Sequence, residues 1–313
     1  MPPLNVLFHF AAGPDLAARL AALSSPLLRV TPCAEANAAV LAEVDVLWHV
    51  LSPATSGMIA AAARLRLIQK IGVGVNTIDL EAARSRGIPV CNLPGTNARA
   101  VAELTLALML ATLRRLPMFD AAMREGRGFA LEPALQDGLG ELGGRTVGLV
   151  GYGAVPRALA PVLAALGCRV IYTARTPRGD AAGEFVSLDR LLCEADVVSL
   201  HVPLTKDTER MIDADALARM RPGAVLINTA RGGLVDSTAL VRALRDGRLA
   251  AAGLDVFADE PVRSDDPLLR LANVVLTPHV GWLTTGTFDR SFALAVENCR
   301  RLVGGEALLH RVV

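Results

Sequence analysis

Short apolar runs alternate with amphipathic stretches along the first third of the chain. The runs have strand length and are rich in aliphatic residues; they span residues 5–10, 27–31, 44–50, 65–71 and 88–93. Strands that alternate with helices predict a parallel sheet with helices on both faces. A long apolar helix, expected from about residue 99 to 118, ends this series, and a loose segment rich in glycine follows at 126–140.

A second series with the same rhythm begins at Thr146. Its expected strands span residues 146–150, 169–173, 196–202, 223–230, 251–257 and 273–280, and a last helix covers 284–303. The two series predict an α/β protein with two parallel-sheet domains.

Composition agrees with this organisation, because 313 residues suffice for two domains with sizeable cores. The 32 Lys and Arg residues against 31 Asp and Glu residues leave a net charge of +1, which argues against nucleic acid or an anionic membrane as the main partner. Five cysteines without a paired spacing predict reduced thiols rather than disulfides or a metal site. The first residues have no pattern of a signal peptide, so we expect a cytoplasmic protein.

A glycine-rich turn follows the strand expected at 146–150. Gly151, Tyr152, Gly153, Ala154 and Val155 lead from that strand into a helical run, which is the arrangement of a dinucleotide-binding loop. The first glycine permits the tight turn, and the second lets the backbone approach a pyrophosphate at the helix N-terminus. Pro156 stands where the third glycine of the fingerprint is expected. The alternative is a purely structural turn between strand and helix.

The end of the next strand bears on the choice of cofactor. An NAD site places a carboxylate there for the ribose 2′-hydroxyl, but this chain has Ala174 followed by Arg175, Thr176 and Arg178. Without the acid, guanidinium groups can bind a 2′-phosphate, so the sequence favours NADP(H), with NAD(H) still possible. The alternative is that both arginines line a solvated loop.

Three polar residues follow three strands of the second series. Arg231, Glu260 and His279 lie past the strands expected at 223–230, 251–257 and 273–280. Strand carboxyl ends are where open α/β sheets bind ligands, so the three side chains can converge. In the reduction of a keto acid, Arg231 can bind the carboxylate and polarise the carbonyl, His279 can donate a proton, and Glu260 can orient the imidazole. Each residue taken singly also suits a structural role.

These motifs in this order resemble the D-isomer-specific 2-hydroxyacid dehydrogenase family over nearly the whole chain. The matching segments are IGVGVNTIDL (71–80), LPGTNARAVAELTLALML (93–110), GELGGRTVGLVGYG (140–153), LHVPLT (200–205), INTARGGLVD (227–236), GLDVFADEP (253–261) and TPHVGW (277–282). In the cofactor loop the chain is similar to NADP(H)-dependent glyoxylate/hydroxypyruvate reductases, which also carry a small residue followed by arginine.

The resemblance implies roles for individual residues. Arg231, Glu260 and His279 take the family's catalytic roles, and the backbone amides of Val73 and Gly74 bind the substrate carboxylate. Trp282 is expected to line the substrate pocket together with Arg231 and His279. The residues expected to border the dinucleotide, beyond those already named, are His201, Val202, Pro203, Thr208, Thr229, Ala230, Asp255 and Gly281.

The resemblance also implies a flavodoxin-like substrate domain formed by residues 1–97 and 284–313, and a Rossmann-like dinucleotide-binding domain formed by residues 98–283. A cleft between them and a homodimer through the helix at 99–118 are expected. No metal is expected.

The expected reaction is reduction of a small 2-keto acid, such as glyoxylate or hydroxypyruvate, to the D-2-hydroxy acid by NADPH. The segment 51–57 lacks arginine, which favours a substrate without a phosphate. The alternatives are an NAD-dependent dehydrogenase of another 2-hydroxy acid or of formate or phosphite, and a dinucleotide-sensing protein without catalysis.

Overall fold

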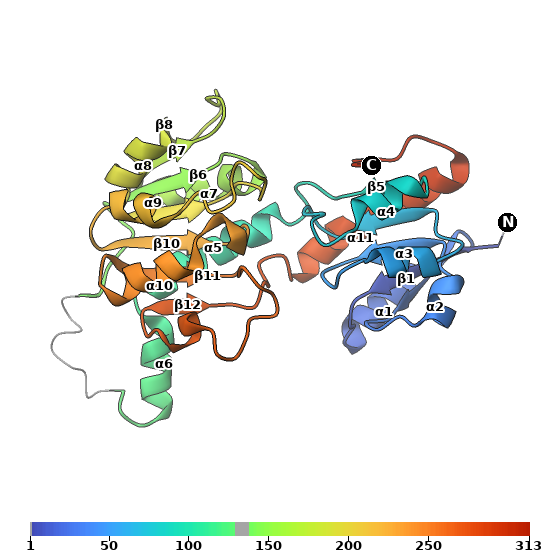
Figure 1. Cartoon of the computed structure of the whole chain (residues 1–313), viewed down its shortest axis with the longest axis horizontal. Coiled ribbons are helices and arrows are strands. Elements are labelled where there is room, and N and C mark those ends of the chain that lie inside the picture. The colour runs from blue at the N-terminus through green and yellow to red at the C-terminus, as the bar shows by residue number, and fades with distance from the viewer. Residues whose placement is uncertain (1, 129–137) are drawn as a thin grey trace. The chain divides into compact units, whose positions relative to one another are not determined.

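The computed structural model describes residues 2–128 and 138–313, and the chain divides into two compact units (Figure 1). Unit 1 consists of Met1–Asn97 and Thr284–Val313, and unit 2 of Ala98–Leu283. Each unit contains one sheet in which every paired strand is parallel. The prediction of an α/β protein with two parallel sheets is therefore confirmed.

Unit 1 is built on a five-stranded sheet with the order β2-β1-β3-β4-β5. The strands are β1 (Leu4–His9), β2 (Leu28–Pro32), β3 (Val46–His49), β4 (Leu67–Lys70) and β5 (Val90–Cys91). The helices are α1 (Pro14–Ala22), α2 (Ala38–Ala42), α3 (Ser56–Ala61), α4 (Leu80–Ser85) and α11 (Thr285–Gly304). Side chains of Asn37, Thr55, Asp79 and Thr284 cap four of these helices by accepting a backbone N–H, which explains where each helix begins.

Helix α11 belongs to unit 1 although the whole of unit 2 separates it from Asn97 in the sequence, and it is the red helix beside the blue strands in Figure 1. Its Phe292 stacks on Trp48 of β3 with ring centroids 5.7 Å apart and meets Phe8 of β1 edge-on at 5.9 Å. The aliphatic side chains of Leu7, Leu47 and Ile68 point to the opposite face and join a second cluster with α2, α3 and α4. The sheet is thus covered on both faces.

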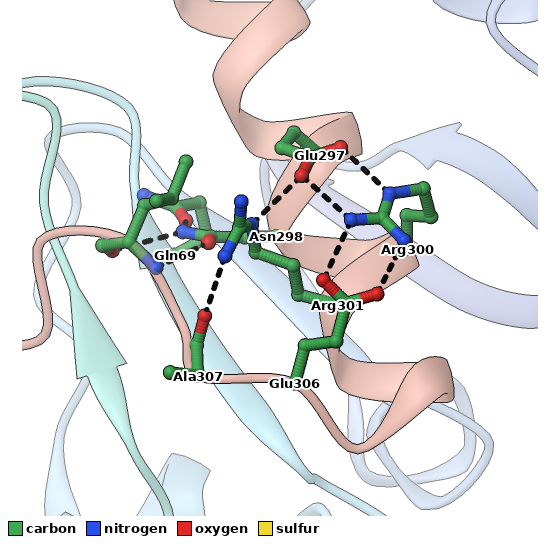
Figure 2. Close-up of polar contacts among 8 residues, drawn as sticks. Gln69, Glu297, Asn298, Arg300, Arg301, Glu306 and Ala307 are labelled. Carbon is green, nitrogen blue, oxygen red and sulfur yellow. Dashed lines mark hydrogen bonds and ion pairs between the residues drawn. The ribbon is translucent and has the colours of Figure 1, made fainter.

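Polar contacts near the end of α11 hold the C-terminal segment to the sheet (Figure 2). Asn298 is fully buried and donates to Gln69 Oε1 of β4 at 2.6 Å, while its Oδ1 accepts the N–H of Leu309 at 2.8 Å. On the exposed side, the carboxylates of Glu297 and Glu306 both pair with Arg300. Burial distinguishes these two sets of contacts, since only the first is shielded from water.

Replacing Asn298 with alanine is expected to lower the free energy of unfolding by about 2–4 kcal/mol, because the Gln69 oxygen and the Leu309 N–H lose their buried partner. Replacing Arg300 with alanine breaks exposed ion pairs and should cost at most about 1 kcal/mol. Chemical denaturation of the two variants and of the parent chain measures both effects. Equal losses in the two variants would contradict the role assigned to Asn298.

Unit 2 contains a seven-stranded sheet with the order β12-β11-β10-β9-β6-β7-β8. Its strands are β6 (Thr146–Val150), β7 (Arg169–Thr173), β8 (Glu184–Phe185), β9 (Val197–Leu200), β10 (Ala224–Asn228), β11 (Leu249–Leu254) and β12 (Val274–Leu276). The chain runs outward from β6 in one direction through β7 and β8, and in the other direction from β9 to β12. The strand order therefore reverses between β6 and β9, the position at which open parallel sheets bind ligands beyond their carboxyl ends.

The helices of unit 2 cover both faces of its sheet. They are α5 (Ala98–Leu113), α6 (Leu116–Arg124), α7 (Ala154–Ala165), α8 (Leu188–Glu194), α9 (Ala214–Arg219) and α10 (Ser237–Arg245), with 3₁₀ turns at Gly232–Leu234 and Pro267–Arg270. One buried cluster joins the sheet to α5 and α7, and the other joins it to α8, α9 and α10. Strands buried on both faces explain the near-continuous apolar runs of the sequence.

Two expectations about unit 2 are wrong in detail. The helix expected from 99 to 118 ends at Leu113, and a second helix begins at Leu116. Arg115 adopts a left-handed backbone with φ of 50°, Pro117 has no N–H to continue the helix, and the carbonyl of Leu113 accepts the N–H of Gly140 instead. The two-residue strand β8 was not expected, because its residues lack an apolar run.

The loose segment expected at 126–140 lies mostly outside the described residues. Within residues 2–128 and 138–313, no helix combines the length and the apolar character needed to cross a membrane.

Candidate functional site

The turn after β6 has the backbone that a dinucleotide-binding loop requires. Gly151 has φ of +98°, and a Cβ atom at this position would lie 2.6 Å from the carbonyl oxygen of His201. A Cβ atom added to Gly153 would have no atom within 4 Å, so the loop is open on that side. Glycine is thus needed at 151 for conformation and contact, while at 153 it leaves room for another group to approach.

Helix α7 begins directly after this turn. Its N-cap residue, Gly153, contributes no side-chain hydrogen bond, and Ala154 and Val155 are the first two helical residues. Pro156 is the third helical residue, where the absent N–H costs no intrahelical bond, and its ring is buried. Exposed N–H groups at the start of a 12-residue helix, next to an open glycine, fit the pyrophosphate of a dinucleotide.

The loop after β7 carries the candidate residues for the 2′-position of the ribose. Arg175, Thr176 and Arg178 are exposed, and Ala174 at the strand end is partly buried. Neither arginine forms an ion pair with a residue of the described ranges. Two exposed cations that form no ion pair suit a phosphate better than a hydroxyl group.

Other expected cofactor residues lie at the carboxyl ends of β9 and β10. The hydroxyl of Thr208 donates to the carbonyl of Pro203 at 2.7 Å and so closes the loop that follows Val202. Burial lowers the pKa of His201 to about 3, so its imidazole is neutral and bonds with Ser199 Oγ at 2.9 Å. Thr229 bonds through its hydroxyl to Thr105 of α5 at 2.9 Å, and Ala230 follows it.

Arg231 follows these residues directly. Asn228 is buried at the end of β10; its amide oxygen accepts the N–H of Ala230 at 3.0 Å, and its amide nitrogen donates to the carbonyl of Arg231 at 2.8 Å. Burial lowers the pKa of the Arg231 guanidinium, and the negative charge of Glu260 opposes this shift. Arg231 is therefore a cation in a partly desolvated place near a carboxylate.

His279 and Glu260 form a direct pair. The imidazole Nδ1 lies 2.6 Å from Glu260 Oε2, and the other carboxylate oxygen accepts the N–H of Phe257 at 3.0 Å. Burial alone raises the pKa of Glu260, but the hydrogen bonds from His279 and Phe257 and the charges of His279 and Arg231 outweigh it, so the pKa is lowered overall. The carboxylate is ionised, Nδ1 carries a proton, and Nε2 is the imidazole atom left to exchange one.

Asp255 shapes the turn that presents His279. Its buried carboxylate accepts the Thr277 hydroxyl at 2.6 Å and the N–H groups of Val280 and Gly281 at 2.9 Å each. His279 has φ of 54°, and the indole of Trp282 donates to its carbonyl at 2.9 Å. A left-handed histidine is uncommon, and these contacts account for its persistence.

Gly232 lets the Arg231 segment approach the segment that carries Glu260. A Cβ atom on Gly232 would lie 1.9 Å from the carbonyl carbon of Phe257. No side chain can occupy that space while the backbone stays in place.

Val73 and Gly74 belong to unit 1, in the loop after β4. The side-chain amide of Asn92 donates to the carbonyl of Val73 at 2.9 Å, and Leu93 donates to the carbonyl of Gly72 at 2.8 Å. The N–H groups of Val73 and Gly74 donate to no backbone or side-chain atom of the described residues. Further along, this loop borders a pocket of about 440 Å³ without basic residues, lined by Pro53, Ala54, Thr55, Ser56, Asn76, Thr77, Ile78 and Asp79.

Known proteins match most of this chain in sequence. Residues 106–281 match the family described as "D-isomer specific 2-hydroxyacid dehydrogenase, NAD binding domain". A glyoxylate reductase of Thermococcus litoralis is 40% identical over 273 residues, which cover 84% of this chain and 82% of that protein. The chain belongs to the D-isomer-specific 2-hydroxyacid dehydrogenase family.

Other family members extend the comparison. A solved NADPH-dependent glyoxylate/hydroxypyruvate reductase from Sinorhizobium meliloti has a TM-score of 0.83 and 31% identity, with 99% of this chain and 98% of that chain covered. A D-3-phosphoglycerate dehydrogenase of Mycobacterium bovis is 41% identical over 253 residues, or 80% of this chain. The matched region is 47% of that relative, so this family member spans about half the length of the phosphoglycerate dehydrogenases that it matches.

Within unit 2 of this family member, the structure brings Arg231, Glu260 and His279 together. Three supporting residues were missed by the sequence analysis: Asn228, Gly232 and Asp255 in its role as an anchor of the His279 turn. Asn228 lies three positions before Arg231 and Gly232 directly follows it, within a matching motif, which is the signal that could have singled them out. Among the described residues, no cluster of three or more His, Cys, Asp or Glu side chains could hold a metal ion.

Proposed function

We propose that this chain reduces a small, non-phosphorylated 2-keto acid to the D-2-hydroxy acid with NADPH as the reductant. The observation that carries the proposal is the 2.6 Å contact between His279 Nδ1 and Glu260, next to the partly desolvated Arg231. The family and its glyoxylate reductase members support the reaction class.

In this mechanism, Arg231 binds the substrate carboxylate through its planar fork and polarises the carbonyl group as negative charge develops on the oxygen. The carbonyl carbon would receive its hydride from the nicotinamide when that cofactor is bound. His279 delivers the Nε2 proton to the carbonyl oxygen, and Glu260 keeps the imidazole in the required orientation and balances its charge. Trp282 fixes the carbonyl of His279 through its indole N–H.

The chain's own residues suit the proposed cofactor. The pyrophosphate would be held by Gly151, Gly153, Ala154 and Val155. The residues at the carboxyl ends of β9 and β10 would border the rest of the dinucleotide. Arg175 and Arg178 would bind the 2′-phosphate. The N–H groups of Val73 and Gly74 in unit 1 would bind a carboxylate, and the lack of arginine in the segment 51–57 favours a substrate without a phosphate.

Initial rates test this proposal directly. We expect oxidation of NADPH in the presence of glyoxylate, hydroxypyruvate or pyruvate, and slower oxidation of NADH at equal concentration. Faster oxidation of NADH would contradict the choice of cofactor but not the reaction. Binding of both dinucleotides without turnover of any of the three acids would contradict the reaction and favour a sensing role.

Replacing Arg175 and Arg178 together with alanine is expected to raise KM for NADPH about 10- to 100-fold, because the 2′-phosphate loses charge-assisted hydrogen bonds. KM for NADH should change by less than about twofold, since no 2′-phosphate is present. Arg263→Ala is a matched control, because Arg263 is an exposed arginine of the same unit that pairs with Asp265. Equal changes in KM for both cofactors would argue against phosphate recognition.

We also propose a homodimer, as the resemblance implies. Three exposed apolar side chains on α5 and α6 support it, namely Leu110, Leu116 and Met123. Light scattering of the purified chain measures its mass in solution, which distinguishes a dimer from a monomer.

A further inference from the structure

The chain contains only two tyrosines, and they pack against each other in unit 2. The ring centroids of Tyr152 and Tyr172 lie 4.3 Å apart, and the ring centroid of Phe185 in β8 lies 5.6 Å from that of Tyr172. Both tyrosines are buried in the cluster beneath α5 and α7. Tyr152 lies between the two glycines of the phosphate loop, and Tyr172 lies in β7, just before the loop with the two arginines.

Both phenol groups bind the backbone of that second loop. The Tyr172 hydroxyl accepts the N–H of Arg178 at 2.8 Å and donates to the carbonyl of the same residue at 3.3 Å. The Tyr152 hydroxyl accepts the N–H of Ala182 at 2.8 Å. The two hydroxyl groups therefore hold both ends of the segment 178–182.

Further contacts complete the fold of this segment. Ala181 donates its N–H to the carbonyl of Arg178 at 3.2 Å, and Asp180 pairs with Arg157 of α7. The ion pair is exposed and contributes little, whereas the tyrosine contacts are partly buried and come from two buried side chains. The position of the Arg178 backbone thus depends mainly on one buried hydroxyl group.

Packing alone does not explain these hydroxyl groups. Phenylalanine would fill the same apolar space, and a buried phenol is tolerated only because it finds a partner. Here the partners are backbone atoms of an otherwise exposed loop. A loop held in one conformation before binding loses less entropy when its arginines take up a phosphate.

We propose that Tyr152 and Tyr172 are positioning residues for cofactor selectivity, whose hydroxyl groups fix the loop at 175–182 so that Arg175 and Arg178 meet the 2′-phosphate of NADP(H). This inference rests on the proposed preference for NADPH. Tyr152 also links the loop to the pyrophosphate turn, because its backbone lies between Gly151 and Gly153. The Tyr152 hydroxyl group thereby fixes the position of the loop at 175–182 relative to the turn at 151–153.

The test uses Tyr152→Phe, Tyr172→Phe and the double variant, each of which removes only hydroxyl groups. Isothermal titration gives Kd for NADP⁺ and NAD⁺, and hydrogen exchange of the cofactor-free chain gives the protection of the Arg178 and Ala182 amides. We expect each single variant to bind NADP⁺ about 3- to 10-fold more weakly, the double variant at least about tenfold, and NAD⁺ to change by less than about twofold. The amide whose acceptor is removed should exchange faster.

Val147→Ala is the control for a general loss of stability. Val147 is buried in the same cluster, on β6, but contacts no loop amide through a polar atom. It should lower stability without changing the ratio of the two dissociation constants. The same change of ratio in Val147→Ala as in the tyrosine variants would overturn the inference.

The remaining outcomes separate the inference from the proposed function. If the parent chain prefers NADP⁺ and the phenylalanine variants keep both that preference and the amide protection, the inference alone is overturned. If the parent chain prefers NAD⁺, the proposed cofactor and the selectivity role of the tyrosines are both overturned.

Discussion

Replacing His279 with glutamine is expected to lower kcat for keto-acid reduction about 10²- to 10⁴-fold, with Kd for the dinucleotide changed by less than about twofold. The loss follows from the removal of the proton donor, since glutamine can offer a hydrogen bond but cannot transfer a proton. Because Nδ1 is bound to Glu260 at 2.6 Å, the transferred proton must come from Nε2.

Glu260→Gln is the matched comparison for this variant. Glutamine keeps an oxygen that can accept the Nδ1 proton, but its amide nitrogen cannot accept the N–H of Phe257, and the negative charge is removed. We expect a smaller loss of kcat, about tenfold, because the imidazole stays oriented while its positive form loses a counter-charge. Initial rates at saturating cofactor, with thermal unfolding as a check on folding, measure both variants. A kcat of His279→Gln equal to that of the parent chain would exclude His279 as the proton donor.

Replacing Gly232 with alanine is expected to lower kcat/KM at least about 100-fold or to prevent folding altogether. The new methyl group would lie 1.9 Å from the Phe257 carbonyl carbon and 2.0 Å from its oxygen, and neither is a side-chain atom that can rotate away. The segments of Arg231 and Glu260 would have to separate. This separation removes the charge contact on which the candidate site depends.

Gly233→Ala is the control for this change, because it adds the same methyl group one residue later. Its Cβ would meet the end of the Leu204 side chain at 3.0 Å, and that side chain can move. Thermal unfolding and kcat/KM of the two variants give the comparison. Similar behaviour of both would mean that the close contact at Gly232 does not hold the site together.

The order of strands and helices could be predicted because it depends on local patterns. Apolar runs of strand length, separated by helical stretches, indicated every strand except β8, whose two residues are exposed. The break at Arg115 could not be predicted from the apolar pattern, because the pattern continues through it. The break depends on Pro117 and on the Leu113 carbonyl, which accepts the N–H of Gly140 from a distant part of the chain.

The candidate site also combines features that the sequence predicts with features that depend on the tertiary structure. That Arg231, Glu260 and His279 lie beyond strand ends follows from the sequence, because parallel strands bring their carboxyl ends to one edge. That Glu260 and His279 form a pair, and that Gly232 makes room for it, depends on the way two of those ends meet in space.

The α/β class, the two βα series and the candidate site residues follow from the amino-acid order alone, because periodicity and motif spacing act over a few neighbouring residues. The folded structure was needed to show that Asn298 binds the last helix to β4, that Asp255 holds the His279 turn, and that two tyrosines hold the arginine loop. Each of these depends on how the folded chain brings particular polar groups together. These contacts stabilise the fold because a buried polar group cannot bind water, so its burial costs free energy unless it finds a partner within the protein.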